Sequence, residues 1–142
     1  MDVCIDLDGS CLTHEYPSLG KDIGAVPVLK RLVKNGHNLI LWTMRSDGQV
    51  DQLLENGYQI HAGDFLTQAV EWFKENDIPL YGIQRNPEQD IWTSSPKAYA
   101  QLYIDDAALG CPLKFDEKLS RRPFIDWVRV EKMLEEMTIL KC

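Results

Sequence analysis

Short apolar segments alternate with amphipathic segments along most of this chain, and that alternation restricts the fold more than any other feature. Four short apolar segments predict buried strands, and the residues between them repeat with helical spacing. Strands that are separated by helices pair in parallel, and the helices then cover the sheet. We therefore predict an α/β fold in which a doubly wound parallel sheet forms the middle of three layers. The predicted strands are residues 3–6, 37–43, 78–83 and 101–106.

Four helices are predicted between and after these strands from apolar spacing and from helix start and stop signals. They are residues 24–35, which stop at Gly36; a segment capped by Ser46 or Asp47 that ends at Gly57; a segment capped by Asp64; and a last helix that Pro123 opens. Their apolar faces are expected to contain Val26, Leu29, Leu32 and Val33; Val50, Leu53 and Leu54; Leu66, Ala69, Val70 and Phe73; and Trp127, Val130, Leu134 and Met137.

Composition agrees with one globular domain over residues 1–142. The chain has 142 residues, 44% of them hydrophobic, which is enough for a substantial core. No apolar run approaches the length of a membrane span, and the N-terminus lacks the pattern of a signal peptide, so we expect a cytoplasmic protein without a membrane partner. The net charge of −7 disfavours nucleic acid as a partner. The cysteines show no metal-binding spacing and are expected to be reduced: Cys4, Cys11, Cys111 and Cys142.

Acidic residues gather at the ends of the predicted strands, which is where parallel sheets bind ligands. The first strand runs into "CIDLDGS", with two aspartates two positions apart. A hydroxyl and a guanidinium follow the second strand, an adjacent pair of aspartates ends the fourth, and one lysine precedes it. The candidate site residues are Asp6, Asp8, Thr43, Arg45, Lys97, Asp105 and Asp106.

These residue types are consistent with phosphoryl transfer. Several carboxylates at one point repel each other, so they need a cation, and oxygen ligands without histidine or thiolate select a hard ion such as Mg²⁺. One carboxylate can attack phosphorus as a nucleophile, and a second can protonate the leaving oxygen and then activate water. A hydroxyl and an ammonium group can hold the phosphoryl oxygens as charge develops on them.

Four segments in order, "DLDGS", "LILWTMR", Lys97 and "YIDDAALG", resemble the four motifs of the haloacid dehalogenase superfamily of phosphohydrolases, and they span residues 4–110. The resemblance implies a parallel sheet with the nucleophile strand at its centre. It also implies a role for each matching residue. Asp6 would be the nucleophile, Asp8 the general acid and base with a metal-binding carbonyl, Thr43 the phosphate-binding hydroxyl, Lys97 the lysine that steadies nucleophile and phosphate, Asp105 a metal ligand and Asp106 a support of the metal shell.

The roles of Arg45 and of residues 11–23 are not fixed by the motifs. Arg45 is compatible equally with gripping a substrate anion and with pairing with a surface acid. Residues 11–23 are too few for a folded cap domain, so we expect a capless protein in which they form a flap. The first candidates for substrate contact on this flap are His14, Glu15 and Tyr16, although His14, like His37 and His61, also fits a structural or surface role.

The leading hypothesis is a magnesium-dependent phosphatase that acts through an aspartyl-phosphate on a small or bulky phosphorylated substrate. A phosphotransferase shares the first half of that reaction, so the motifs do not separate the two. A non-catalytic protein that binds a phosphorylated ligand is a further alternative, but Asp6 and Asp8 are both present. A signalling receiver domain is disfavoured because Lys97 precedes Asp105. An apolar C-terminal helix could support a homo-oligomer.

Overall fold

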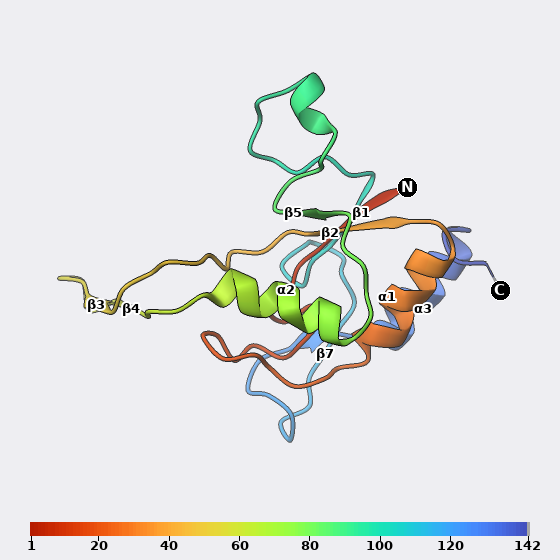
Figure 1. The fold of residues 1–142 in the computed structure, drawn as a ribbon. Coiled ribbons are helices and arrows are strands. Elements are labelled where there is room, and N and C mark those ends of the chain that lie inside the picture. Colours follow the sequence, from red (N-terminus) through yellow and green to blue (C-terminus); the bar gives the residue numbers. More distant parts are fainter. Residues whose placement is uncertain (142) are drawn as a thin grey trace.

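A four-stranded parallel sheet forms the centre of the structure, a computed structural model that describes residues 1–141 (Figure 1). The sheet order is β5-β2-β1-β6, so β1 lies in the interior. Ile5 at the end of β1 pairs with Leu41 on β2 and with Ile104 on β6. The predicted parallel α/β arrangement is confirmed. The strands are β1 Asp2–Ile5, β2 Asn38–Leu41, β5 Gly82–Ile83 and β6 Leu102–Ile104.

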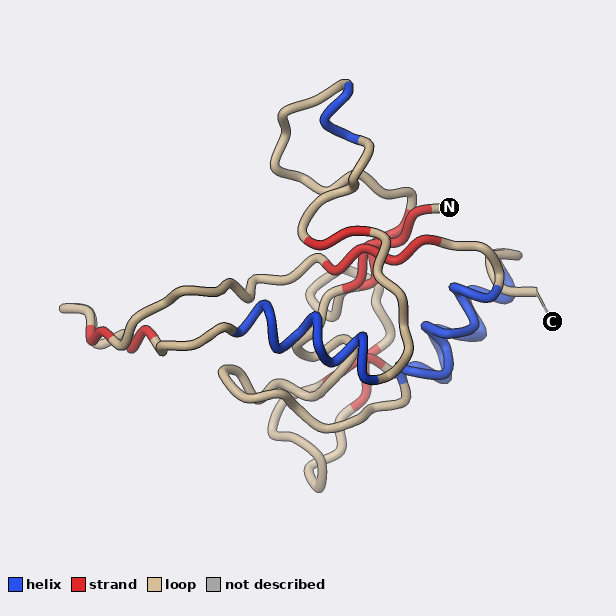
Figure 2. Tube along the Cα trace, in the orientation of Figure 1, coloured by secondary structure: helices blue, strands red, loops and turns tan. Residues whose placement is uncertain are grey.

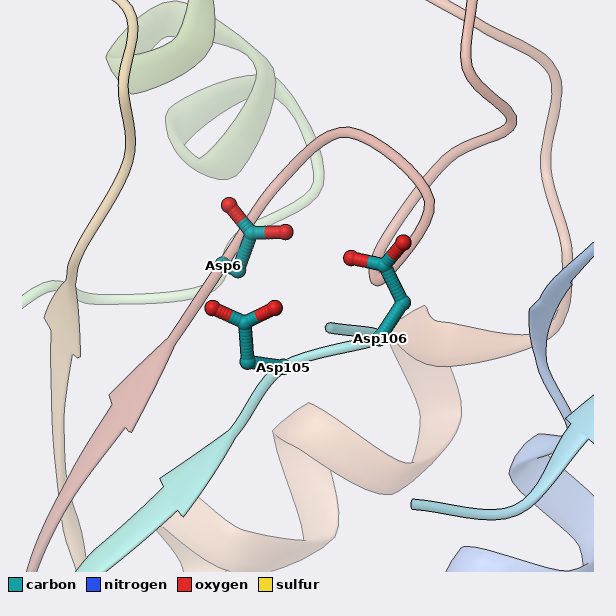
Figure 3. A group of neighbouring side chains, drawn as sticks. All are labelled: Asp6, Asp105 and Asp106. Carbon is teal, nitrogen blue, oxygen red and sulfur yellow. The ribbon is translucent and has the colours of Figure 1, made fainter. Parts of the chain in front are cut away.

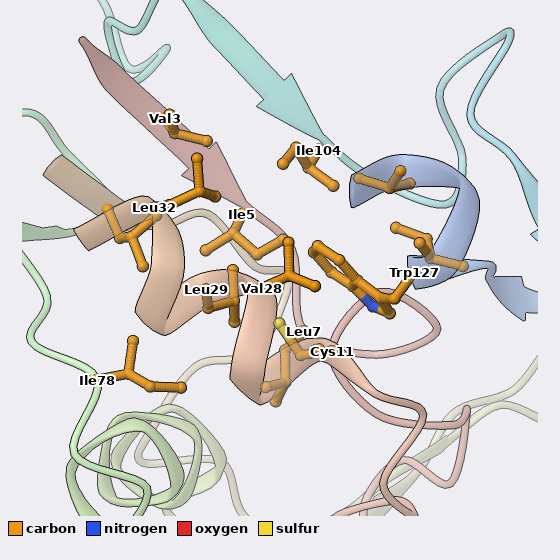
Figure 4. Close-up of a cluster of buried hydrophobic side chains, with 14 of the residues drawn as sticks. Val3, Ile5, Leu7, Cys11, Val28, Leu29, Leu32, Ile78, Ile104 and Trp127 are labelled. Atoms are coloured by element: carbon orange, nitrogen blue, oxygen red, sulfur yellow. The ribbon is translucent and has the colours of Figure 1, made fainter. Parts of the chain in front are cut away.

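Three helices build the main core against one face of this sheet. Alternate β1 residues, Val3 and Ile5, point into a cluster that also contains Leu29 of α1 and Trp127 of α3 (Figure 4). Phe73 of α2 belongs to the same cluster. Every one of these side chains is almost fully buried, as the helical spacing predicts for Leu29, Phe73 and Trp127. The helices are α1 Ala25–Lys34, α2 Phe65–Glu75 and α3 Trp127–Glu136.

The opposite face of the sheet is covered differently. Cys4 of β1 and Ile40 of β2 pack there against Ala98, in a much smaller cluster. The covering segment is the loop 84–101, which contains only a short 3-10 helix, η1 (Gln89–Ile91), and projects above the sheet in Figure 2. The structure therefore shows a parallel sheet flanked by helices, whereas the three-layer arrangement is not confirmed.

The helix predicted after Ser46 is wrong. Residues 46–63, here called the arm, extend away from the core as a narrow hairpin of β3 (Gln52–Leu53) and β4 (Gln59–Ile60) (Figures 1 and 2). The supposed apolar face is solvent-exposed, with Leu53 69% accessible, because the arm has no surface to pack against. Asn-Gly at 56–57 is a common hairpin turn, and Gly57 has a φ of 85°. The sequence pattern instead predicts the end of a helix at this glycine.

The other departures are local. Asp64 precedes α2 without a capping bond from its side chain, and Asp47 instead accepts the Thr67 N–H of the first turn of α2 at 2.9 Å. The final helix begins at Trp127 rather than at Pro123, because residues 124–125 form a strand, and Met137 is exposed instead of inward. The extra strand pair is β7 Leu113–Lys114 with β8 Phe124–Ile125.

Two further predictions concern the chain as a whole. Within residues 1–141, no helix combines the length and the apolar character needed to cross a bilayer. Cys4, Cys11 and Cys111 are free thiols, as expected, while Cys142 lies outside the described residues.

Candidate active site at the carboxyl ends of β1 and β6

The candidate site lies where the order of strands reverses. From β1 the chain adds β2 and then β5 on one side, and returns to place β6 on the other side. The carboxyl ends of the two strands at such a reversal enclose a crevice that binds ligands in open α/β sheets. Asp6 follows β1 directly, and Asp105 and Asp106 follow β6. The Asp6 N–H donates to the Ile104 carbonyl at 3.1 Å, which holds the two strand ends together.

Three of the four predicted acidic residues converge in this crevice. One carboxylate oxygen from each of Asp6, Asp105 and Asp106 lies within 4.8 Å of the other two (Figure 3). All three residues are half-buried. Their carboxylates approach one another from the ends of adjacent strands, so the sheet itself fixes their spacing.

The turn that follows β1 is built to hold Ser10 between two of these acids. The Leu7 carbonyl accepts the N–H groups of Ser10, Cys11 and Leu12, which closes a tight turn. Ser10 Oγ lies 2.8 Å from Asp6 Oδ2 and 3.1 Å from Asp106 Oδ1, and it accepts the Asp106 N–H at 3.0 Å. One hydroxyl hydrogen serves only one carboxylate at a time, so the second contact becomes a hydrogen bond only when that carboxyl group carries a proton and donates it to Ser10 Oγ.

The electrostatics of the cluster favour a bound proton or cation. Burial raises the pKa of Asp6 to about 8, and the charges of Asp105 and Asp106 add to this rise, while the bond from Ser10 opposes it. Burial also works to raise the pKa of Asp106, but hydrogen bonds, the first from His14, outweigh it and leave that pKa below its ordinary value. Oxygen donors at this spacing fit a hard divalent ion such as Mg²⁺.

Asp8 does not join the cluster of carboxylates, because Arg45 holds it. The Arg45 guanidinium donates from Nε and Nη2 to the two carboxylate oxygens of Asp8, each at 2.8 Å. It also donates to the flap carbonyls of Pro17 at 3.2 Å and Ser18 at 2.8 Å, and its Cζ lies 5.2 Å from the centre of the Tyr16 ring. Arg45 is only 2% exposed, so the acid that it pairs with is the site residue Asp8 and not a surface carboxylate.

Thr43 is held at the end of β2 by Gln84, a residue that the sequence did not single out. The Thr43 N–H donates to the side-chain carbonyl of Gln84 at 2.8 Å, and the Gln84 amide donates to the Thr43 carbonyl at 2.5 Å. Gln84 has a φ of 62°, which is unusual outside glycine. The Thr43 hydroxyl accepts the Arg45 N–H at 3.1 Å, so its own hydrogen can be donated to a ligand.

Lys97 lies near the site but does not contact its acids. Its ammonium lies 5.4 Å from the centre of the Tyr103 ring. Tyr103, with Trp42, Asp6 and Asp105, lines a hollow of about 230 Å³ beside the cluster. Within residues 1–141, no ion pair joins Lys97 to an acid, so its phosphate-binding role stays a prediction.

His14 makes a contact that the sequence does not predict, because the sequence indicates only a flap or structural role for it. Its Nε2 lies 2.8 Å from Asp106 Oδ2. Gly9 makes this possible: a Cβ at that position would lie 1.9 Å from His14 Nε2 and 2.6 Å from Asp106 Oδ2. The glycine that follows Asp8 is therefore required for a close approach as well as for its φ of 83°.

Comparisons with known proteins support the fold and leave the activity open. A solved structure described as a conserved protein coded by a locus of Bacteroides thetaiotaomicron matches with a TM-score of 0.69 and 29% sequence identity. The match covers 96% of this chain and 91% of that one, and the description assigns that protein no activity. No protein-family model and no curated protein matches the chain.

Proposed function

We propose that this protein is a magnesium-dependent phosphatase that hydrolyses phosphate monoesters through an aspartyl-phosphate on Asp6. The observation that carries the proposal is the convergence of Asp6, Asp105 and Asp106 at the reversal point of the sheet, with Asp8 two residues beyond Asp6. The resemblance of four motifs to the haloacid dehalogenase superfamily supports the same assignment. A capless, three-layered form of that fold and a cytoplasmic location belong to this proposal.

Asp6 would supply the nucleophile. One of its carboxylate oxygens attacks phosphorus, the bond from phosphorus to the ester oxygen breaks, and the departing oxygen takes a proton from Asp8. Water then attacks the phosphorus of the acyl phosphate and loses a proton to Asp8, which releases inorganic phosphate and restores Asp6. Arg45 holds both oxygens of Asp8, but each oxygen keeps a further lone pair that can accept a proton.

Asp6, Asp105 and Asp106 are the side chains that would hold Mg²⁺, and the carbonyl of Asp8 is a further candidate ligand. Bound there, the ion would offset the repulsion among the carboxylates and the charge of the phosphoryl oxygens. Thr43, whose hydroxyl hydrogen is free, can donate to one of those oxygens. Lys97 can reach another only by leaving the face of Tyr103.

Phosphate release from p-nitrophenyl phosphate and a panel of natural monoesters tests the proposal. We expect Mg²⁺-dependent release by the wild type and at least a roughly 1,000-fold lower kcat for Asp6→Asn, because an amide is not nucleophilic. The variant Asp90→Asn is the matched control, since Asp90 is exposed and, among residues 1–141, pairs with Arg85 alone. Release that persists in Asp6→Asn, or that ignores a chelator, contradicts the proposal.

A further inference from the structure

A second hollow, of about 430 Å³, lies beside the acidic cluster, between the flap and residues 117–122. His14 lines it and also contacts Asp106 at 2.8 Å. Asp106 in turn shares Ser10 with Asp6, through contacts of 3.1 and 2.8 Å. A continuous series of contacts therefore leads from the proposed nucleophile to the wall of this hollow, which we call the basic hollow.

The charge of the basic hollow is opposite to that of the whole protein. It is lined by Lys21, Lys118, Arg121 and Arg122 against two carboxylates, Glu15 and Glu117, while the chain carries a net charge of −7. Within residues 1–141, none of the four cations forms an ion pair. Uncompensated guanidinium groups in a concave surface are suited to an oxyanion, which they can bind through paired N–H groups.

Hydrogen bonds hold the backbone on both sides of the basic hollow. The Lys21 ammonium donates to the Leu119 carbonyl at 2.8 Å, which ties the flap to the opposite wall. Asp116 accepts the N–H of Lys118 at 3.0 Å on its side chain and that of Ser120 at 3.0 Å on its carbonyl. Because these bonds restrain the turn, the cost of ordering the backbone around the three remaining cations, Lys118, Arg121 and Arg122, is reduced.

We propose that the basic hollow binds a second phosphate group of the substrate, so that the preferred substrates are monoesters with two phosphate groups. This inference rests on the proposed function, because it assigns the first phosphate to Asp6. His14 forms the boundary between the two phosphate positions. A substrate with a single phosphate can react at Asp6 but leaves the guanidinium groups of Arg121 and Arg122 without a partner.

Inhibition of p-nitrophenyl phosphate hydrolysis by the full chain tests this inference without knowledge of the substrate. The inhibitors are alkane bisphosphonates of increasing chain length, each compared with the alkyl monophosphonate of the same length, with free Mg²⁺ kept in excess. We expect at least one bisphosphonate to bind about 10-fold or more tightly than its partner, as bonds to charged groups allow. The double variant Arg121→Ala/Arg122→Ala should lose this preference for bisphosphonates. Its kcat for p-nitrophenyl phosphate, which has a single phosphate, should equal that of the wild type.

The control is Arg129→Ala/Lys132→Ala, which removes two exposed cations from α3 and changes the net charge equally. Equal loss of preference in both double variants, or equal inhibition by both inhibitor classes, overturns the inference. The single variant Lys118→Ala gives an independent reading of the same hollow. If the wild type hydrolyses neither p-nitrophenyl phosphate nor any monoester of the panel, the proposed function fails, and calorimetric binding of the same inhibitor pairs then decides about the hollow alone.

Discussion

Arg45 is the residue on which the shape of the site depends most, because it joins the acid Asp8 to the flap. Its guanidinium is buried and satisfies two carboxylate oxygens and two flap carbonyls. Arg45→Met keeps much of the volume but leaves a partly buried carboxylate and two carbonyls without their donors. We expect a loss of about 3 kcal/mol in the free energy of unfolding, measured by urea denaturation.

Arg129→Met is the control for Arg45→Met, because it makes the same substitution at an arginine without such an ion pair. Arg129 is exposed, and within residues 1–141 it forms no ion pair, so its loss should change the free energy of unfolding by less than about 0.5 kcal/mol. Equal stabilities for the two variants would show that Arg45 does not anchor Asp8 and the flap.

The sequence predicts the positions of some site residues but not the residues that contact them. Asp6, Asp105 and Asp106 could be predicted to meet, because a strand end is a defined position in a parallel sheet. The partners of these residues could not, since His14 contacts Asp106 across 92 positions and Gln84 contacts Thr43 across 41. Such contacts depend on how loops fold back over the sheet, and no local pattern encodes that.

The arm is the element that contributes least to the core. The side chains of Val50, Leu53 and Tyr58 are each more than 60% exposed. At the base of the arm, Asp47 caps α2, and the His61 ring lies 6.5 Å from that of Tyr16 on the flap. Replacing residues 49–62 by a short Gly-Ser turn should therefore keep cooperative thermal unfolding and shift Tm by no more than a few degrees. Loss of the cooperative transition would show that the arm is part of the folding unit.

Among the elements, burial separates the correct predictions from the wrong ones. Apolar residues at strand or helix spacing predicted β1, β2, β6, α1 and α2 correctly. These predictions hold because the apolar residues of each element are buried in the core. The arm also has apolar residues at helical spacing, but no surface lies opposite them. The turn at Asn56–Gly57 then decides the local structure, so apolar spacing without a packing partner gave a wrong helix.

For the molecule as a whole, we expect the acidic cluster to make stability depend on pH and on Mg²⁺. Asp6 has a pKa of about 8 in the folded protein without metal and an ordinary value of 3.8. Between these values the folded state holds a proton that the unfolded state has lost, so the free energy of unfolding falls as pH rises. Asparagine at this position cannot ionise and removes this contribution.

Urea unfolding of the wild type and Asp6→Asn at about pH 5 and about pH 8 measures that contribution. In a chelator, the stability of Asp6→Asn relative to the wild type should rise with pH, because only the wild type must ionise a carboxylate beside Asp105 and Asp106. At the higher pH, excess Mg²⁺ should raise the free energy of unfolding of the wild type above that of Asp6→Asn. The reason is that a cation stabilises the ionised cluster, and the variant lacks one of its charges. Parallel pH profiles would show that the neighbours of Asp6 do not raise its pKa, and equal stabilisation of both proteins by Mg²⁺ would show that Asp6 is not part of a metal site. The sheet would then bring the three carboxylates together without the electrostatic coupling that the proposed chemistry requires.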